Sequence, residues 1–188
     1  MIVNKCRICD NKLKNPIHSN KNKAISKWPT NKKYKDICMT LNAYSCEECN
    51  LLQLQRFGQE KVLKFYEGPQ YIIENNKLLK ERYKLITRRI TKKEFKNKKI
   101  LEIGGGRNNI LKYFKDSKKY INDISIVNKN LKNVKKIPGV FSKKKFKKKY
   151  FNYIIFFHTL EHIEDPKLFL KDVYEILKDC GKIIIEVP

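Results

Sequence analysis

Residues 101–108 read Leu-Glu-Ile-Gly-Gly-Gly-Arg-Asn, and they indicate the fold of the second half of the chain. The apolar residues around Glu102 are typical of a buried strand. Glycines directly after a strand let the backbone approach a ligand closely, and the start of the following helix offers free N–H groups. A tight turn can also contain glycine for its own geometry, so the loop alone leaves both interpretations open.

Strands and helices alternate on both sides of this loop. Short apolar runs predict strands at residues 100–103, 120–123, 134–140, 153–157 and 182–187. One helix between them has an apolar face over residues 110–114. Another begins with Asp165 and Pro166, has an apolar side that reaches Leu177, and ends at Gly181. This alternation predicts parallel βαβ units, and therefore an α/β protein with a Rossmann-like parallel sheet.

Three zones differ in pattern, and we expect them to be separate parts. Residues 1–55 hold five of the six cysteines and are too few for a good core, so they predict a small module that needs a staple. Residues 56–97 predict a helical linker, because apolar residues recur there at helical spacing: Leu78, Leu79, Tyr83, Ile86 and Ile90. Residues 98–188 form the predicted α/β domain. Such sheets normally continue beyond a fifth strand, so we expect a fragment or truncated product with an incomplete sheet.

Two Cys-x-x-Cys pairs lie in the first zone, Cys6 with Cys9 and Cys46 with Cys49. Each pair can direct two thiolates at one ion, and together they predict a tetrahedral four-thiolate zinc site. A disulfide pairing is the alternative, disfavoured because the chain start has no room for the apolar region of a signal peptide. Two residues between the pairs could replace a ligand: His18 and Cys38. Four thiolates leave no open coordination position, so we expect a structural metal.

The formal net charge is +24, from 43 Lys and Arg against 19 Asp and Glu. A nucleic-acid partner is therefore possible, but it is not favoured, because only six of these residues are arginine, the side chain that makes bidentate contacts. The lysine run at residues 143–149 predicts a solvated loop. No apolar run approaches the roughly 20 residues of a membrane span. We expect no membrane insertion and a cytoplasmic protein.

Three segments together resemble the class I S-adenosylmethionine-dependent methyltransferases: residues 102–106, residues 122–125 (Asn-Asp-Ile-Ser) and residues 156–166 (Phe-Phe-His-Thr-Leu-Glu-His-Ile-Glu-Asp-Pro). The first motif of that family is an acid, any residue, and then Gly-x-Gly-x-Gly. Glu102, Gly104 and Gly106 match it, while Asn108 stands at the third glycine. Asparagine tolerates left-handed backbone better than most residues.

The resemblance implies a role for each matching residue. Gly104 and Gly106 would line the methionine part of S-adenosylmethionine, and Glu102 would support that loop. Asp123 lies 17 residues after Gly106 at the end of a predicted strand, where an acid can accept hydrogen bonds from ribose hydroxyls. It could instead cap a turn. His158 would be a close neighbour of the cofactor.

The segment Leu160-Glu161-His162-Ile163 is typical of one broad branch of this family. His162 could serve as the catalytic general base, since the pKa of histidine lies near working pH, and Glu161 could orient it. Alternatively, both residues only shape the loop that leads into the next helix.

The cysteine pairs extend the resemblance to methyltransferases with an N-terminal zinc-binding domain, among them sugar C-methyltransferases that act on nucleotide-linked sugars. A glycine commonly follows each pair in that family, and here Asp10 and Asn50 do. The family also has tyrosines near the active site, for which Tyr66 and Tyr71 in the linker are candidates. An important Glu-His pair would follow the fifth strand, beyond the chain.

The sequence thus predicts a zinc-containing, S-adenosylmethionine-dependent methyltransferase that acts on a small molecule such as a nucleotide-linked sugar. A truncated, inactive copy fits the same pattern. The alternative is a nucleic-acid-binding or interaction protein, in which a zinc ribbon makes the contacts and the α/β part is a relic.

Overall fold

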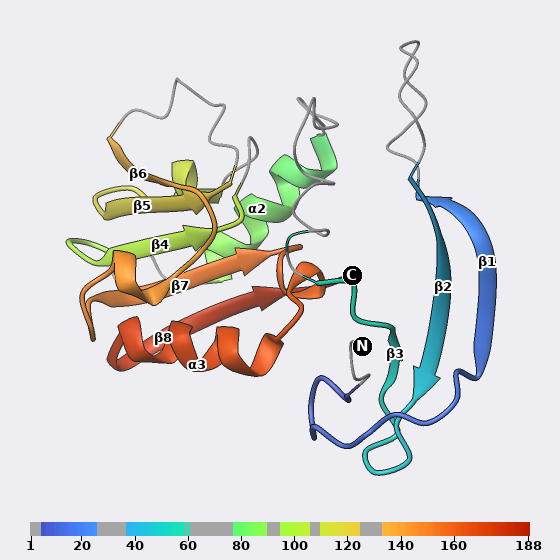
Figure 1. Ribbon diagram of the computed structural model, residues 1–188. Coiled ribbons are helices and arrows are strands. Elements are labelled where there is room, and N and C mark those ends of the chain that lie inside the picture. The colour runs from blue at the N-terminus through green and yellow to red at the C-terminus, as the bar shows by residue number, and fades with distance from the viewer. Residues whose placement is uncertain are drawn as a thin grey trace. The chain divides into compact units, whose positions relative to one another are not determined.

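The structure is a computed structural model that describes residues 5–25, 37–58, 60, 77–89, 95–105, 110–124 and 133–188. The chain divides into two compact units. One consists of Met1–Tyr71 together with Glu164–Lys167, and the other of Ile72–Ile163 together with Leu168–Pro188. Each unit contains its own sheet (Figure 1). None of the described helices is long and apolar enough to cross a membrane.

The first unit contains a three-stranded antiparallel sheet in the order β1-β2-β3. Its strands are β1 (His18–Ile25), β2 (Ile37–Ser45) and β3 (Leu52–Leu54). The sequence did not reveal this sheet, because β1 consists largely of polar residues and lacks an apolar alternation. Among the described residues of this unit, the buried cluster comprises Cys6, Leu13, Tyr44 and Cys46. Two of these four residues are cysteines of the Cys-x-x-Cys pairs.

The second unit contains a five-stranded parallel sheet. Its strands are β4 (Lys99–Ile103), β5 (Lys118–Asp123), β6 (Val134–Pro138), β7 (Phe151–Phe157) and β8 (Leu177–Glu186). They lie in the order β6-β5-β4-β7-β8, with every neighbouring pair parallel. The chain order therefore reverses beside β4, at the centre of the sheet. This topology confirms the predicted α/β class with a Rossmann-like sheet, preceded by a four-cysteine cluster.

Apolar side chains cover both faces of the parallel sheet. On one face, α2 (Lys77–Arg89) and the 3₁₀ helix η2 (Ile110–Tyr113) pack against it through Tyr83, Ile110 and Leu111. On the other face, α3 (Pro166–Ile176) contributes Val173 and Ile176. The central strands β4 and β7 are buried along most of their length, so they read as mainly apolar runs in the sequence, whereas β6 at the edge is partly exposed.

Two predicted helices differ in the structure. Residues 110–113 form a short 3₁₀ helix, although Ile110, Leu111 and Phe114 share a buried face as expected. The prediction that Gly181 ends the later helix is wrong, because α3 ends at Ile176.

The early end of α3 has a local cause. The backbone N–H groups of Lys149 and Tyr150 donate to the carbonyls of Glu175 and Ile176, at 3.0 and 2.8 Å. These bonds satisfy carbonyls that a helix end leaves unpaired. Leu177 then pairs with Phe151, so it begins β8 instead of extending the helical face.

The lysine run at residues 143–149 is partly structural. It includes the 3₁₀ helix η3 (Lys143–Lys145). Lys143 pairs with Asp172 and Glu175 of α3 at 3.0 and 2.6 Å, and Lys149 pairs with Asp179 at 2.9 Å. Part of the run therefore fixes the loop before β7 through ion pairs. The prediction of a solvated loop did not include these ion pairs.

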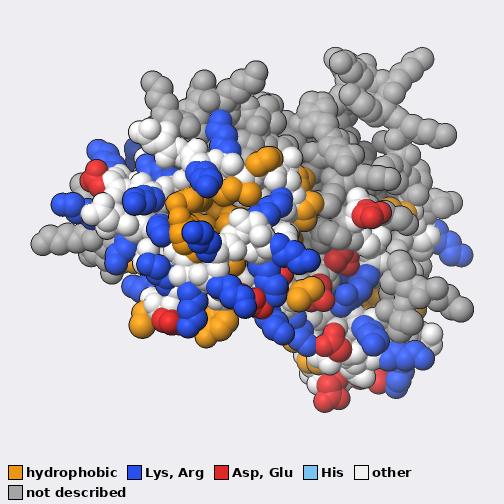
Figure 2. All heavy atoms as spheres, turned by 60° about the vertical axis from the view of Figure 1, so that its left-hand side comes forward, with side chains coloured by type: hydrophobic (Ala, Val, Ile, Leu, Met, Phe, Trp, Pro, Cys, Tyr) orange, Lys and Arg blue, Asp and Glu red, His pale blue; other side chains and the backbone are white. Residues whose placement is uncertain are grey.

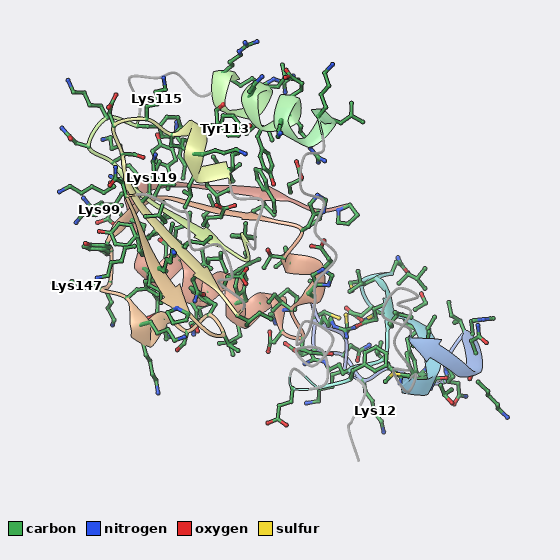
Figure 3. All side chains as sticks on the ribbon, turned by 90° about the horizontal axis from the view of Figure 1, so that it is seen from above. Lys12, Lys99, Tyr113, Lys115, Lys119 and Lys147 are labelled. Atoms are coloured by element: carbon green, nitrogen blue, oxygen red, sulfur yellow. The ribbon has the colours of Figure 1, made fainter. Side chains whose placement is uncertain are left out.

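Other lysines gather at the amino ends of the parallel strands. Lys99 and Lys119 lie at the starts of β4 and β5, and Lys147 precedes β7. Figure 3 shows them with Lys115 along one side of the sheet. A space-filling view shows lysine and arginine side chains around an apolar area of this part of the molecule (Figure 2). Ligands of such sheets bind at the carboxyl ends of the strands, so these lysines lie at the opposite edge from the expected ligand site.

Candidate cofactor site and candidate metal centre

Three predicted site residues meet at the carboxyl edge of the parallel sheet. Gly104 follows β4, Asp123 ends β5, and His158 follows β7. These strands are neighbours, in the order β5-β4-β7. The structure therefore brings together residues that lie far apart in the sequence, at the point where the strand order reverses.

Gly104 occupies a position that only glycine fits. Its φ is +73°, and a Cβ built there would lie 2.3 Å from Oγ1 of Thr159. Thr159 is itself held in place, since its hydroxyl can donate to either of two carbonyls, that of Phe157 at 3.0 Å or that of Ile103 at 3.2 Å. The Gly104 N–H donates to the carbonyl of Asn122 at 2.8 Å. The loop after β4 thus packs directly on the segment after β7.

Gly105 is equally confined, because a Cβ there would lie 2.6 Å from Cδ of Glu102. Both glycines therefore serve close packing of the loop, and they leave backbone rather than side chains at its surface. Two residues of the predicted motif lie outside the described residues: Gly106 and Asn108.

Glu102 is a buried carboxylic acid beneath the glycine loop, with 3% of its surface exposed. Its Oε1 accepts a hydrogen bond from the N–H of Ile110 at 3.2 Å, which ties β4 to the start of η2. Burial, aided by the charge of Asp123, raises the pKa of Glu102 to about 8. Its buried Oε2 accepts no hydrogen bond from the described residues.

Asp123 lies at the end of β5 with 8% of its surface exposed. Its carbonyl accepts the Gly139 N–H at 2.9 Å. The neighbouring Asn122 amide donates to the carbonyls of Ile137 and Gly139, at 2.8 and 2.9 Å, and so holds β5 to the turn after β6. The alternative role of Asp123 is to cap a turn before Ser125, and Ser125 lies outside the described residues.

Two histidines lie beside this edge. His158 has a left-handed backbone, with φ +47°, and its N–H donates to the carbonyl of Glu186 at 2.9 Å. His162 belongs to the 3₁₀ helix η4 (Leu160–His162). Burial lowers the pKa of His162, so its imidazole favours the neutral form that can accept a proton. Nε2 of His162 lies 4.0 Å from Oε1 of Glu161, beyond hydrogen-bond distance.

Sequence analysis missed three residues of this edge. Thr159 fills the space that Gly104 leaves open. Glu186 ends β8 and faces His158, with Oε1 3.0 Å from Nε2. Arg82 of α2 pairs with Glu186 at 2.5 Å. An acid at the end of an apolar strand was a usable signal for Glu186, since carboxyl ends form the ligand-binding edge. The sequence of α2 contains several basic residues, and its pattern did not distinguish Arg82 from them.

The four predicted cysteines form one cluster in the first unit. The sulfur atoms of Cys6, Cys9, Cys46 and Cys49 all lie within 4.8 Å of one another. Sγ of Cys9 lies 3.4 Å from that of Cys46, and Sγ of Cys6 lies 3.6 Å from that of Cys49. Tetrahedral zinc with bonds of about 2.3 Å would set sulfur atoms roughly 3.8 Å apart. All four thiols are free, so the disulfide alternative is not what the structure contains.

The two cysteine pairs adopt the same backbone conformation. The Cys6 carbonyl accepts the Asp10 N–H at 3.1 Å, and the Cys46 carbonyl accepts the Asn50 N–H at 2.8 Å. Asp10 and Asn50 have φ values of 60° and 57°. This left-handed conformation explains why glycine suits these positions, and asparagine and aspartate are among the residues that tolerate it best.

Arg7 fastens the first pair to β3. Its guanidinium donates to the carbonyls of Leu54 and Gln55 at 2.6 and 3.2 Å, and its backbone N–H donates to Oε1 of Gln53 at 3.2 Å. Burial opposes ionisation of the Cys6 thiol, but hydrogen bonds from the backbone N–H groups of Cys9 and Ile8 outweigh it. The pKa of Cys6 falls to about 6, whereas burial and the neighbouring sulfur atoms raise the pKa values of Cys9 and Cys49.

Two residues between the pairs had been considered as alternative ligands. His18 begins β1 and is not among the four residues that cluster in the described part of the chain. The Cys38 side chain lies outside the described part, as do Tyr66 and Tyr71 of the linker.

A family model for a methyltransferase domain matches residues 76–188. No curated protein matches the chain. Among solved structures, a Pyrococcus horikoshii protein is 24% identical with a TM-score of 0.50, over 65% of this chain and 64% of that one. A SAM-dependent methyltransferase from Aquifex aeolicus is 19% identical with a TM-score of 0.50, over 69% of this chain and 72% of that one. At these identities the likeness shows the fold, and this chain spans just under two thirds of the Pyrococcus protein.

Proposed function

The chain belongs to the methyltransferase-domain family, and we propose that it is an S-adenosylmethionine-dependent methyltransferase acting on a small molecule. S-adenosylmethionine is the cofactor of this family. When bound, it supplies a methyl group activated by attachment to a positively charged sulfur. The carboxyl edge of the parallel sheet is the proposed site.

The observation that carries this proposal is the construction of the loop after β4. Gly104 and Gly105 present backbone at its surface, because any Cβ would meet Thr159 or Glu102. Glu102 holds the loop from below through the Ile110 N–H. A loop built in this way admits a ligand close to the main chain, which suits the methionine part of the cofactor. Gly106 is proposed to continue this surface.

Asp123 is the proposed ribose contact. It ends β5, the strand next to β4. Neighbouring strands of a sheet lie about 5 Å apart. A carboxylate there can accept hydrogen bonds from two adjacent hydroxyls. His158 directly precedes Thr159, which packs against Gly104 in the loop after β4. His158 is therefore proposed to lie beside the cofactor.

Removal of the acceptor's proton needs a base, and His162 and His158 are the two candidates at this edge. The lowered pKa of His162 keeps its imidazole neutral and able to accept a proton. Nε2 of His158 lies 3.0 Å from Oε1 of Glu186.

We propose that the four cysteines bind one zinc ion as a structural site. Four sulfur donors in a tetrahedral arrangement suit zinc, and a closed four-thiolate shell leaves no position for a substrate. The four-cysteine cluster ahead of the methyltransferase domain supports a nucleotide-linked sugar as the substrate class, through the resemblance to zinc-containing sugar methyltransferases.

Calorimetric titration with S-adenosylhomocysteine, the product form of the cofactor, tests the proposal. We expect binding by the full chain, and an Asp123→Ala variant to bind roughly 10- to 150-fold more weakly, from the loss of a charge-assisted hydrogen bond of about 1.5–3 kcal/mol. Asp179→Ala, which removes an exposed acid paired with Lys149, is the matched control. Absence of binding by a folded, zinc-loaded chain would refute the cofactor site and favour an interaction protein.

A further inference from the structure

Glu186 lies between Arg82 and His158 at the carboxyl edge of the sheet. Its Oε2 lies 2.5 Å from Nη2 of Arg82, and its Oε1 lies 3.0 Å from Nε2 of His158. The Glu186 side chain is only 16% exposed, whereas those of Arg82 and His158 are 47% and 45% exposed. Arg82, Glu186 and His158 come from α2, the end of β8 and the end of β7. Neither Glu186 nor Arg82 has a place in the proposed cofactor site.

Glu186 also fixes the backbone of His158. The His158 N–H donates to the Glu186 carbonyl at 2.9 Å, while His158 adopts a left-handed conformation, with φ +47°. A left-handed backbone is uncommon for a residue other than glycine, although histidine adopts it more often than most, and the bond to Glu186 holds His158 in it. One residue therefore constrains both the main chain and the imidazole of His158.

Other charged groups face His158 less closely. Oε1 of Glu161 lies 3.6 Å from Nδ1, beyond hydrogen-bond distance. His162 follows in the same 3₁₀ helix as Glu161. Oε1 of Glu186 is buried and accepts no well-aligned hydrogen bond from the described residues, although Nε2 is 3.0 Å away. A rotation of the ring that aligns an Nε2–H with Oε1 satisfies this buried acceptor.

We propose that Glu186, clamped by Arg82, is a positioning residue that holds His158 with its hydrogen on Nε2 and leaves Nδ1 as the proton acceptor of the methyl transfer. This inference rests on the proposed function, and it assigns the base to His158 rather than His162. The carboxylate selects the tautomer because it can only accept a hydrogen bond. Arg82 keeps the carboxylate from turning away.

In the proposed step, protons and electrons balance. The acceptor atom forms a bond to the methyl carbon and loses its hydrogen as a proton, which Nδ1 of His158 takes. The electron pair of the broken sulfur–carbon bond stays on the sulfur, which becomes neutral. His158 becomes an imidazolium whose Nε2–H faces Glu186, so the carboxylate stabilises the charge as it develops.

The ring nitrogens of His158 report this role directly. In ¹⁵N-histidine-labelled full-length protein, two-bond ¹H–¹⁵N spectra of the neutral imidazole distinguish a protonated from an unprotonated nitrogen. We expect the hydrogen on Nε2 in the unmodified chain. In Glu186→Gln, Arg82 retains the amide oxygen and the NH₂ group faces Nε2. We therefore expect the hydrogen to move to Nδ1, as in other histidine–carboxylate pairs converted to the amide.

A second variant keeps the test decisive. The double change Arg82→Gln/Glu186→Gln frees the amide to turn its oxygen to His158, so we expect the Nε2–H form to return. Glu81→Gln, which removes the neighbouring ion pair with Lys84 on α2, is the matched control and leaves the tautomer unchanged. The proposal is overturned if Glu186→Gln keeps the Nε2–H form, or if Glu161→Gln changes the tautomer instead.

Cofactor binding separates this inference from the function on which it rests. We expect Glu186→Gln to bind S-adenosylhomocysteine within about twofold of the unmodified chain, since Glu186 acts through His158. If the unmodified chain binds none, the proposed function fails, whereas the tautomer measurement still decides whether Glu186 orients His158. A large loss of binding in the variant would place Glu186 in the cofactor site and overturn the positioning role.

Discussion

The two sheets of this chain are built from opposite kinds of sequence. In β7, the residues are Phe-Asn-Tyr-Ile-Ile-Phe-Phe, and all except Asn152 are buried. In β1, the residues are His-Ser-Asn-Lys-Asn-Lys-Ala-Ile, and the sheet it belongs to has a buried cluster of four residues. Two of those four are cysteines of the candidate metal centre. Apolar burial is thus evident throughout the described parallel sheet, whereas half of the described buried cluster of the first unit consists of cysteines.

Removal of the metal is expected to have the largest effect, and to affect one unit only. With a strong chelator, or in Cys46→Ser, we expect the first unit to lose its fold, because apparent zinc-binding energies of about 10–16 kcal/mol exceed what so small a core supplies. The parallel sheet should persist. Amide spectra of the full chain, with zinc analysis, measure both. Full metal retention by Cys46→Ser would rule out that ligand.

Truncation of a core phenylalanine is the converse test. Phe156 is fully buried between the sheet and α3, so Phe156→Ala should destabilise the parallel sheet by about 3–5 kcal/mol. Tyr174→Ala, at an exposed position of the same helix, is the control. Denaturant unfolding followed by amide spectra should show the metal-containing unit unchanged. Equal losses in both units would contradict their separate stabilisation.

The buried acid beneath the glycine loop predicts a pH dependence. The folded-state pKa of Glu102, about 8, lies above its ordinary value, so the folded chain binds the extra proton and stability falls as pH rises between about 5 and 8. The slope from this group is at most about 1.4 kcal/mol per pH unit. Glu102→Gln should abolish that part of the slope. An unchanged slope would show that the carboxyl does not titrate as the structure indicates.

The turn after the second cysteine pair predicts the smallest effect. Asn50 has a left-handed backbone, so Asn50→Ala should lower stability or metal affinity by about 1 kcal/mol. Asn50→Gly should stay within about 0.5 kcal/mol, since easier backbone geometry offsets the greater freedom of the unfolded chain. Competition with a chromogenic zinc chelator measures the affinity. A worse result for glycine than for alanine would contradict the backbone explanation.

Sequence reasoning succeeded where local chemistry is sufficient. The Cys-x-x-Cys spacing predicted all four clustered cysteines, and apolar runs predicted the strands of the parallel sheet, most clearly the buried strands β4 and β7. The predicted end of the later helix at Gly181 was wrong. Hydrogen bonds from Lys149 and Tyr150, over 20 residues earlier in the chain, satisfy the carbonyls at the end of α3. Arg82 and Glu186 were missed for the same reason. Their contact joins a helix and a strand that lie far apart in the sequence, so no sequence spacing predicts it.

The equivalent cysteine pairs have a consequence for the unfolded chain. Cys9 and Cys46 are 37 positions apart, and the proposed ion would act as a removable cross-link between the two cysteine pairs that flank β1 and β2. By the chain-entropy relation for a covalent link, closing a loop of this length would restrict the unfolded ensemble by about 4 kcal/mol. On the proposed zinc site, the persistence of this polar unit would then follow the supply of metal.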